Sequence, residues 1–244
     1  MVERMTIEQI LNDTLHRPWP LPTTSWKYYQ EWNDAIFLHW KVDFNILNKF
    51  VPREIEIDMF EDSPWISLVA FTMDKVRMQN LPSFPPISCF NEINIRTNVR
   101  HNNKAGVYFL SIEGGTALSC TLAKVISQLP YRYSMMKRSN GYYRSRNSRY
   151  GDKFETTFEI GQPIKVKSQL DRWLTERYAL FQDTPDSINE FEIHHIEWPT
   201  YQIDLKSFEL EYSRFDRLIC GAPSVAHYSS GVQVLGWSKR VKKR

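Results

Sequence analysis

Glycine is scarce in this sequence, with 9 residues among 244, and neither a glycine-rich phosphate loop nor a nucleophile elbow is present. The common nucleotide-binding and hydrolase motifs are therefore excluded. Long apolar runs are also missing, because no stretch reaches the roughly 18 residues that a membrane span needs. The first residues, Met1–Arg4, lack the apolar core of a signal peptide. We therefore expect a cytoplasmic protein with no membrane partner.

Cysteine is equally sparse and carries no recognisable motif. Cys89, Cys120 and Cys220 are odd in number and far apart, which argues against a disulfide framework and against a zinc site built on paired cysteines. Two adjacent histidines, His194 and His195, point to opposite sides of a strand, so they cannot both bind one metal there without a bulge. The sequence predicts no metal site and no cofactor.

Positive charge is concentrated at the end of the chain. Residues 239–244 contain five basic side chains, more than the whole formal net charge of +3, so the rest of the chain is close to neutral. We expect this tail to be solvated and disordered. The segment 140–149 interleaves arginine with tyrosine, a pattern on which single-stranded nucleic acid stacks. Without a basic body, however, the pattern favours an ordinary hairpin, and no nucleic-acid partner is predicted.

The chain is expected to form one domain over residues 1–244, because no flexible linker and no repeat interrupts it. Residues 1–30 form its N-terminal part. A short amphipathic helix is predicted over 6–15, and three prolines then keep the arm at 16–22 extended, so that it wraps the body. The predicted fold is mainly β with a few short helices (α+β).

Alternating apolar residues predict more strands than helices. A short helix is expected after Asp43, which is placed as an N-cap, and a longer one over 168–181, where apolar residues follow helical spacing. The strand segments follow one another at spacings typical of antiparallel meanders. They span 36–42, 55–58, 65–73, 87–100, 106–112, 117–125, 142–150, 154–160, 190–196 and 201–211.

One of these strands carries a charged stripe. Period-two geometry places Glu92, Asn94 and Arg96 on one face over about 13 Å, and the apolar Ile93 and Ile95 on the other. Two interpretations stay open. The stripe is either a solvated outer face, or the inner face of a barrel that offers a carboxylate, an amide and a guanidinium to an anionic ligand.

Further candidate residues lie downstream of the stripe. Tyr131 and Arg132 form a phenolic and basic corner that is expected to face the same cavity, and His39 and His194 are added as candidate ligand-binding residues. Lys124 lies in the apolar segment 117–125. A lysine desolvated there would have a lowered pKa and would be suited to form a Schiff base with a ketone, which makes Lys124 a candidate catalytic residue.

Several dispersed motifs together resemble one known family over nearly the whole chain. In chain order they are His16–Pro22 (HRPWPLP), His39-Trp40, Glu92-x-Asn94-x-Arg96, Leu129–Tyr131, Leu174–Tyr178 (LTERY) and His194-His195-x-x-Trp198-Pro199. This pattern is similar to that of the YqjF-like family of uncharacterised bacterial proteins, domain of unknown function 2071, which is grouped with acetoacetate decarboxylase. The resemblance implies a closed antiparallel β-barrel around a buried polar cavity, with short helices packed outside.

The chain departs from the decarboxylase at the residues that perform its chemistry. Where the decarboxylase has an arginine and a glutamate, this sequence has Lys124 and Val125, and where it has its lysine pair, this sequence has Tyr131 and Arg132 after Pro130. Neither tyrosine nor arginine forms the required imine. The resemblance therefore implies binding of a small molecule without decarboxylation.

Three hypotheses follow for the function. The first is binding of a small anionic or phenolic molecule in a polar barrel cavity, through Glu92, Asn94, Arg96, Tyr131 and Arg132. The second is a divergent Schiff-base lyase that acts on a keto acid through Lys124. The third is an interaction protein whose extended arm and exposed aromatic residues mediate homo-oligomerisation.

Overall fold

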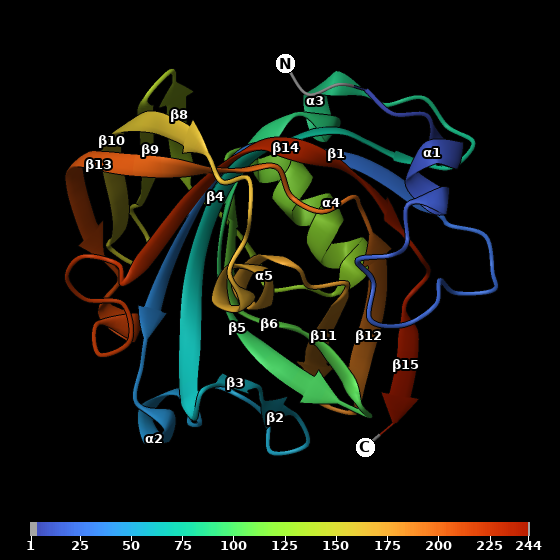
Figure 1. The fold of residues 1–244 in the computed structure, drawn as a ribbon, viewed down its shortest axis with the longest axis horizontal. Helices are drawn as coiled ribbons and strands as arrows, with labels where there is room; N and C mark the ends of the chain where they lie inside the picture. The colour runs from blue at the N-terminus through green and yellow to red at the C-terminus, as the bar shows by residue number, and fades with distance from the viewer. Residues whose placement is uncertain (1–3, 244) are drawn as a thin grey trace.

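A closed ring of seven β-strands is the central feature of the computed structural model, which describes residues 4–243 (Figure 1). In ring order the strands are β12 (Ser187–His194), β11 (Ala179–Thr184), β6 (Lys104–Gly114), β5 (Phe90–His101), β4 (Ser63–Met78), β1 (Tyr28–Lys41) and β14 (Val225–Gly236). Pairing of β14 with β12 closes the ring. Neighbours are antiparallel except β11 and β6, which are parallel. The predicted barrel is confirmed, with one parallel contact in its wall.

A second layer of strands continues from β14 beyond the ring and covers one side of it, at the left in Figure 1. It consists of β13 (Thr200–Glu211), β10 (Asp152–Pro163), β9 (Tyr142–Asn147) and β8 (Met135–Ser139). Phe154 and Tyr143 from this layer pack in one core with Leu38, Leu68 and Ile95 from the ring. The wall formed by β1, β4 and β5 is therefore buried on both faces.

The remaining elements are short and lie around the ring. The helices are α1 (Ile7–Asn12), α2 (Phe44–Leu47), α3 (Pro85–Ser88), α4 (Ala117–Ser127) and α5 (Gln169–Thr175), with a 3-10 turn at Ser213–Phe215. The short strands are β2 (Glu56–Ile57), β3 (Met59–Phe60), β7 (Tyr131–Tyr133) and β15 (Arg240–Lys243). Asp43 caps α2 as predicted, since its carboxylate accepts the amide of Ile46. Across residues 4–243, no helix is long and apolar enough to cross a membrane.

Two helices lie at opposite ends of strand β5 and are both seen within the outline of the ring in Figure 1. Helix α5 is next to the end of β5, where Asn98 Nδ2 donates a hydrogen bond to the carbonyl oxygen of Trp173. Helix α4 is next to its start, where Cys120 Sγ contacts the carbonyl oxygen of Gly114, the register partner of Glu92. The polar stripe of β5 therefore runs from one helix to the other.

Three predictions about individual elements are wrong. Segment 117–125 is helical, because Leu118, Leu122 and Val125 follow helical spacing and not the alternation of a strand. The helix expected over 168–181 ends at Thr175, and the chain re-enters the ring as β11. Residues 240–243 of the tail are not disordered. They pair with β12 as β15, where Lys242 lies 3.6 Å from Glu190, whereas Arg244 lies outside the described residues.

The N-terminal arm packs on the outside of the ring. Arg17 donates to the carbonyl oxygen of Ile193 at 2.6 Å and to Glu192 at 3.2 Å. The indole of Trp19 donates to the same Glu192 carboxylate at 3.0 Å. The arm wraps its own barrel, as expected, so its polar side chains are already engaged within the chain.

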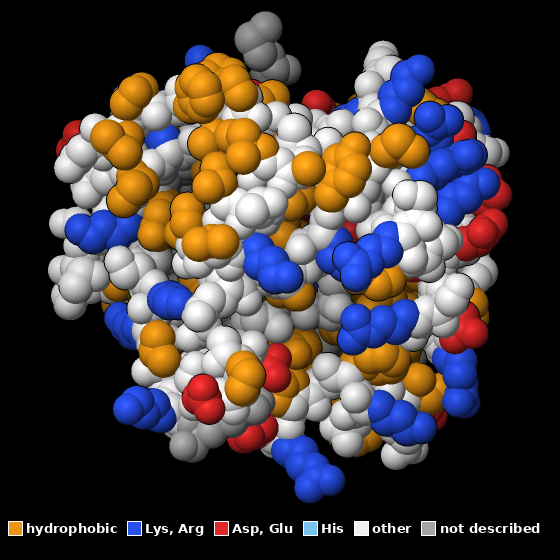
Figure 2. All heavy atoms as spheres, turned by 180° about the vertical axis from the view of Figure 1, so that it is seen from behind, with side chains coloured by type: hydrophobic (Ala, Val, Ile, Leu, Met, Phe, Trp, Pro, Cys, Tyr) orange, Lys and Arg blue, Asp and Glu red, His pale blue; other side chains and the backbone are white. Residues whose placement is uncertain are grey.

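Apolar side chains gather on one exposed face, at the upper left in Figure 2. They come from α4 and from the segment that leads into α3, and the two helices touch through Ser119 Oγ and the carbonyl oxygen of Ile87. The exposed members are Leu118, Leu122, Val125 and Ile126 on α4, and Leu81 and Phe84 before α3. We call these six side chains the α4 face.

Candidate functional site

The charged stripe of β5 is buried inside the ring. Glu92, Asn94 and Arg96 are 3%, 3% and 8% exposed. Their register partners on β4 are Phe71, Val69 and Ser67, and the first two belong to an interior apolar cluster separate from the core under the second layer. The interpretation of the stripe as a solvated outer face is therefore wrong, since the wall that carries it is covered on both sides.

Arg96 is a buried cation that has no carboxylate within ion-pair distance in the described part of the chain, although the charge of Glu92, farther along the stripe, favours its protonated form. Its guanidinium has no ion-pair partner among residues 4–243, and its Nε atom is buried without a hydrogen bond. The ring centroid of Phe37 lies 5.9 Å from the guanidinium carbon. Burial, and then the nearby charge of Arg177, lower the Arg96 pKa to about 10. Arg96 therefore remains charged at neutral pH.

Arg177 brings a second buried guanidinium to the same end of the ring. It follows α5, and its Nη1 atom donates to Asp58 Oδ2 at 2.7 Å while Nε donates to the carbonyl oxygen of Trp173. The remaining nitrogen, Nη2, is buried without a partner. Asp58 also pairs with Arg100 at 2.8 Å. One carboxylate therefore serves two arginines, and Arg96 adds a third positive charge to the region.

The other end of the stripe is acidic and rich in acceptors. The hydroxyl of Tyr131 donates to Glu92 Oε2 at 2.9 Å, and the amide of Asn94 donates weakly to Oε1 at 3.4 Å. Burial raises the Glu92 pKa to about 7, so the carboxyl group is partly protonated at neutral pH. Asn94 Oδ1 is buried without a donor. A ligand hydroxyl placed here would find two acceptors.

His39 lies next to Arg96 on the interior face. His39 is opposite Ser67 on β4, and Ser67 is opposite Arg96 on β5. Its Nδ1 atom lies 2.7 Å from Ser67 Oγ, while Nε2 is buried without a partner. Burial, with the charges of His227 and Arg96, holds the His39 pKa well below its usual value. The imidazole is therefore neutral at physiological pH.

Three predicted site residues lie away from the stripe. Arg132 follows Tyr131 on β7 and so points to the opposite face, where it pairs with Glu113 and Asp152. Lys124 is exposed on α4, so it lacks the desolvation that the Schiff-base hypothesis requires. His194 lies beneath α1, with Nε2 2.7 Å from the carbonyl oxygen of Ile10.

The neighbouring histidine, His195, takes the interior position instead. Its ring is 5.4 Å from that of Trp198 and 4.9 Å from that of Tyr178. Burial lowers its pKa to about 3, which keeps the imidazole neutral. His194 is the last residue of β12 and His195 follows the strand, and the sequence alone did not show which of the two faces inward.

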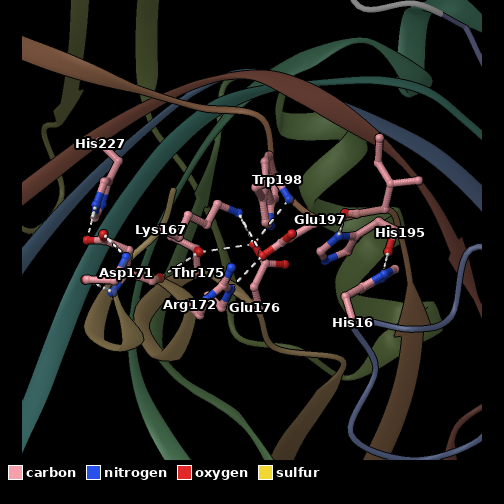
Figure 3. A network of polar contacts seen from close by, with 12 residues as sticks. His16, Lys167, Asp171, Arg172, Thr175, Glu176, His195, Glu197, Trp198 and His227 are labelled. Carbon is pink, nitrogen blue, oxygen red and sulfur yellow. Dashed lines mark hydrogen bonds and ion pairs between the residues drawn. The ribbon is translucent and has the colours of Figure 1, made fainter. Parts of the chain in front are cut away.

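A polar network holds the segment around α5 in the mouth of the ring (Figure 3). Glu176 is its hub: Oε1 accepts hydrogen bonds from Lys167 at 2.6 Å and from the backbone amide of Trp198, and Oε2 accepts from Tyr178. Nearby, Asp171 Oδ1 lies 2.9 Å from His227 Nε2. Sequence reasoning missed these roles, because the contacts to Trp198 and His227 join segments that are distant in the chain.

A cleft of about 580 Å³ opens between the arm and α5. Its lining includes Arg177, Tyr178, Trp173, Arg172 and His16. Arg177 is also close enough to Arg96 to lower the pKa of that residue. Arg177 therefore links the lining of the cleft to the cationic end of the stripe, whereas Arg96 itself does not line the cleft. In the described part of the chain, no group of three or more His, Cys, Asp or Glu side chains is arranged to hold a metal ion.

Comparison with known proteins identifies the family. Residues 29–233 match the model of domain of unknown function 2071, a family of uncharacterised conserved proteins. The chain belongs to this family. It is also 32% identical over 228 residues to the uncharacterised protein YqjF of Bacillus subtilis, an alignment that covers 90% of this chain and 94% of that protein. The resemblance seen in the dispersed motifs is confirmed.

Solved structures of the acetoacetate decarboxylase type share the fold of this family member. Acetoacetate decarboxylase from Legionella pneumophila superposes with a TM-score of 0.62 at 14% identity, over 93% of each chain. The enduracididine biosynthesis enzyme MppR, complexed with the condensation product of pyruvate and imidazole 4-carboxaldehyde, gives a TM-score of 0.61 at 14% identity, over 92% of each chain. At such identities the likeness establishes the fold and leaves the reaction open.

Proposed function

We propose that the ring binds a small organic carboxylate at Arg96. The observation that carries this proposal is the buried guanidinium, which has no carboxylate within ion-pair distance among residues 4–243. Burying an unpaired charge costs several kcal/mol, and proteins that do so usually supply a counter-charge. A bound carboxylate would supply it, and the planar guanidinium is suited to paired hydrogen bonds with such a group. The free Nη2 atom of Arg177 offers a further donor.

The acidic end of the stripe restricts the ligand further. Asn94 Oδ1 and the Glu92 carboxyl group are acceptors for a hydroxyl or a phenol. The stripe from Glu92 to Arg96 spans about 13 Å, so the ligand that fits is a small molecule with a carboxylate at one end and a hydroxyl or phenol at the other. MppR, which shares the fold, has also been solved with pyruvate. That complex favours short carboxylates as the first compounds to test.

A thermal-shift screen of short carboxylates and phenols tests this proposal. We expect selected carboxylates to stabilise the wild-type protein and to lose at least about 30-fold in affinity in Arg96→Met, as expected for loss of a charge-assisted pair. Arg146→Met is the matched control, because Arg146 is half-exposed on the second layer. The proposal fails if no carboxylate binds, or if Arg96→Met and Arg146→Met bind equally well.

We also propose that the α4 face pairs with a second copy of this chain. Its six side chains are 37% to 74% exposed, and α4 carries Lys124 as its one charged residue. A standard interface takes ~800 Å² from each partner, and the α4 face would form the apolar centre of such a contact. A two-fold contact places the same apolar helix on both sides, which satisfies the self-complementarity of a homodimer.

Light scattering at micromolar concentration tests this pairing. We expect a dimer for the wild-type protein and a monomer for the double variant Val125→Glu/Ile126→Glu, since both positions are exposed and the change affects only the surface. Val166→Glu, at an 82% exposed position elsewhere, is the control. A monomeric wild-type protein would contradict the proposal.

A further inference from the structure

Two histidines on neighbouring strands face each other inside the ring. His39 on β1 and His227 on β14 have ring centroids 5.5 Å apart, and their ring planes are inclined at 66°. Both residues are buried, and each has one ring nitrogen without a hydrogen-bond partner, Nε2 in His39 and Nδ1 in His227. Buried ring nitrogens are normally satisfied. An unpartnered nitrogen on each of two facing rings indicates groups that are able to bind a ligand.

The other nitrogen of each histidine is held in place. His227 Nε2 lies 2.9 Å from Asp171 Oδ1 (Figure 3), and because a carboxylate only accepts, Nε2 carries the proton and Nδ1 is a bare acceptor. His39 Nδ1 lies 2.7 Å from Ser67 Oγ, and a hydroxyl that donates here leaves the proton on Nε2. The pair then presents one acceptor and one donor. A carboxylate that orients a histidine is the usual support of a general base.

These groups lie beside the proposed carboxylate anchor. Arg96 is connected to His39 through Ser67, the residue between them in the sheet register. The ring of Phe37 stacks on that of His39 and also lies beneath the Arg96 guanidinium. The base, the donor and the anion anchor therefore surround one region of the interior.

We propose that this region catalyses proton exchange at the carbon next to the carbonyl group of a short 2-oxo acid, an inference that rests on the proposed carboxylate site. Arg96 holds the carboxylate. The C3–H bond breaks, its proton passes to His227 Nδ1, and its electron pair forms the C2=C3 double bond. The carbonyl π electrons move onto oxygen, which accepts a hydrogen bond from His39 Nε2. Return of a solvent proton to C3 restores the 2-oxo acid, so no second reactant is consumed.

The chemistry requires no lysine imine. In the described chain the buried lysine near this region is Lys167, and its ammonium group is already engaged by Glu176 at 2.6 Å. A neutral base next to a fixed positive charge is suited to this reaction. Arg96 offsets the charge of the carboxylate and so favours the second negative charge, which the electron pair of the C3–H bond places on the enolate oxygen. Asp171 is a positioning residue, since it acts through His227.

Proton NMR of pyruvate in D₂O tests the proposal. Loss of the methyl signal measures exchange, and saturation transfer in the same sample measures binding. We expect wild-type protein to accelerate exchange by at least about 100-fold over buffer, as positioned general bases do. His227→Gln should lose this acceleration and keep binding. Asp171→Asn should lower exchange at saturating pyruvate with unchanged Kd, and His101→Gln, a histidine outside the ring interior, should match wild type.

The outcomes separate the two proposals. Pyruvate that binds without exchange above the buffer rate, or exchange that is equal in His227→Gln and wild type, overturns the proton-exchange inference and leaves the binding proposal intact. Binding of other carboxylates but not of pyruvate or 2-oxobutanoate also overturns only this inference. If no carboxylate binds at all, the proposed function fails and the inference fails with it. Where His227→Gln does not fold, His227→Asn is measured under the same criteria.

Discussion

Glu92 and Arg96 show how the position of a single side chain inside the ring changes its chemistry. Both are ionisable, both lie on one strand face, and burial acts on each in the direction of the neutral form. Their charge states at neutral pH differ because the ordinary pKa values of a glutamate and an arginine differ. Glu92 reaches a pKa near 7 and titrates in the physiological range, whereas Arg96 stays charged. The stripe therefore has one switchable end and one permanently cationic end.

Replacing Glu92 by Gln is expected to remove one pH-dependent contribution to stability. The Glu92 pKa is raised to about 7, so between about pH 4.5 and 7 the folded protein holds a proton that the unfolded chain has lost. The free energy of unfolding therefore falls as pH rises through this window, by about 3 kcal/mol once the carboxylate is ionised. Urea unfolding should show that Glu92→Gln gains stability relative to wild type from pH 5 to pH 8. If the difference in unfolding free energy between Glu92→Gln and wild type were the same at pH 5 and pH 8, the raised pKa of Glu92 would be contradicted.

Helix α5 and the residues after it hold the mouth of the ring through one carboxylate. Glu176 accepts from Lys167, Tyr178 and the Trp198 amide. Its loss would leave the buried ammonium of Lys167 with the more distant carboxylate of Glu197, at 3.7 Å. Replacing one partner of a buried ion pair lowers the free energy of unfolding more than replacing both partners does, because it leaves one charge buried and unpaired. The same segment carries Arg177. Replacing Glu176 would therefore also shift Arg177 and disturb the cationic end of the stripe.

A double-mutant cycle measures this coupling. We expect Glu176→Gln to lose about 3 kcal/mol of unfolding free energy. The double variant Lys167→Met/Glu176→Gln should lose less than the sum of the two single variants by about 1–3 kcal/mol. Urea denaturation of the four proteins at pH 7 provides the numbers. Strict additivity would show that Lys167 and Glu176 do not act as a pair.

At the level of elements, pattern and composition predicted the strands better than the helices. The strand that carries the stripe was predictable, because alternating Ile93 and Ile95 against charged neighbours is typical of a wall with two different faces. The segment 117–125 was read as a strand from its continuous apolar character, which short buried strands and helices share. The pairing of His39 with His227 was not predictable, since the closed ring brings together residues from the two ends of the chain.

The whole molecule encloses several neutral histidines, and this sets its response to acid. His39 and His195 are fully enclosed, with pKa values lowered well below normal and to about 3, mainly by burial. As pH falls, the unfolded chain protonates such a histidine at a higher pH than the folded protein does. Stability is therefore complete above about pH 6.5, the value of an unfolded histidine, and is lost as pH falls below it.

Acid sensitivity is best measured in the Glu92→Gln background, because Glu92 acts in the opposite direction between pH 4.5 and 7. We expect the free energy of unfolding to fall between pH 6.5 and 5 by up to about 1.4 kcal/mol per pH unit for each enclosed histidine. Replacing His195 by Gln should make this fall less steep. A free energy of unfolding that does not change over this range would contradict the neutral state of these side chains.

The central claim is that Arg96 is the anchor of a carboxylate ligand inside the ring. A crystal structure with the tightest-binding carboxylate from the thermal-shift screen tests it most directly. The account predicts ligand density inside the ring, with a carboxylate oxygen about 3 Å from the Arg96 guanidinium. A ligand bound elsewhere, with the guanidinium of Arg96 free of it, would contradict the account.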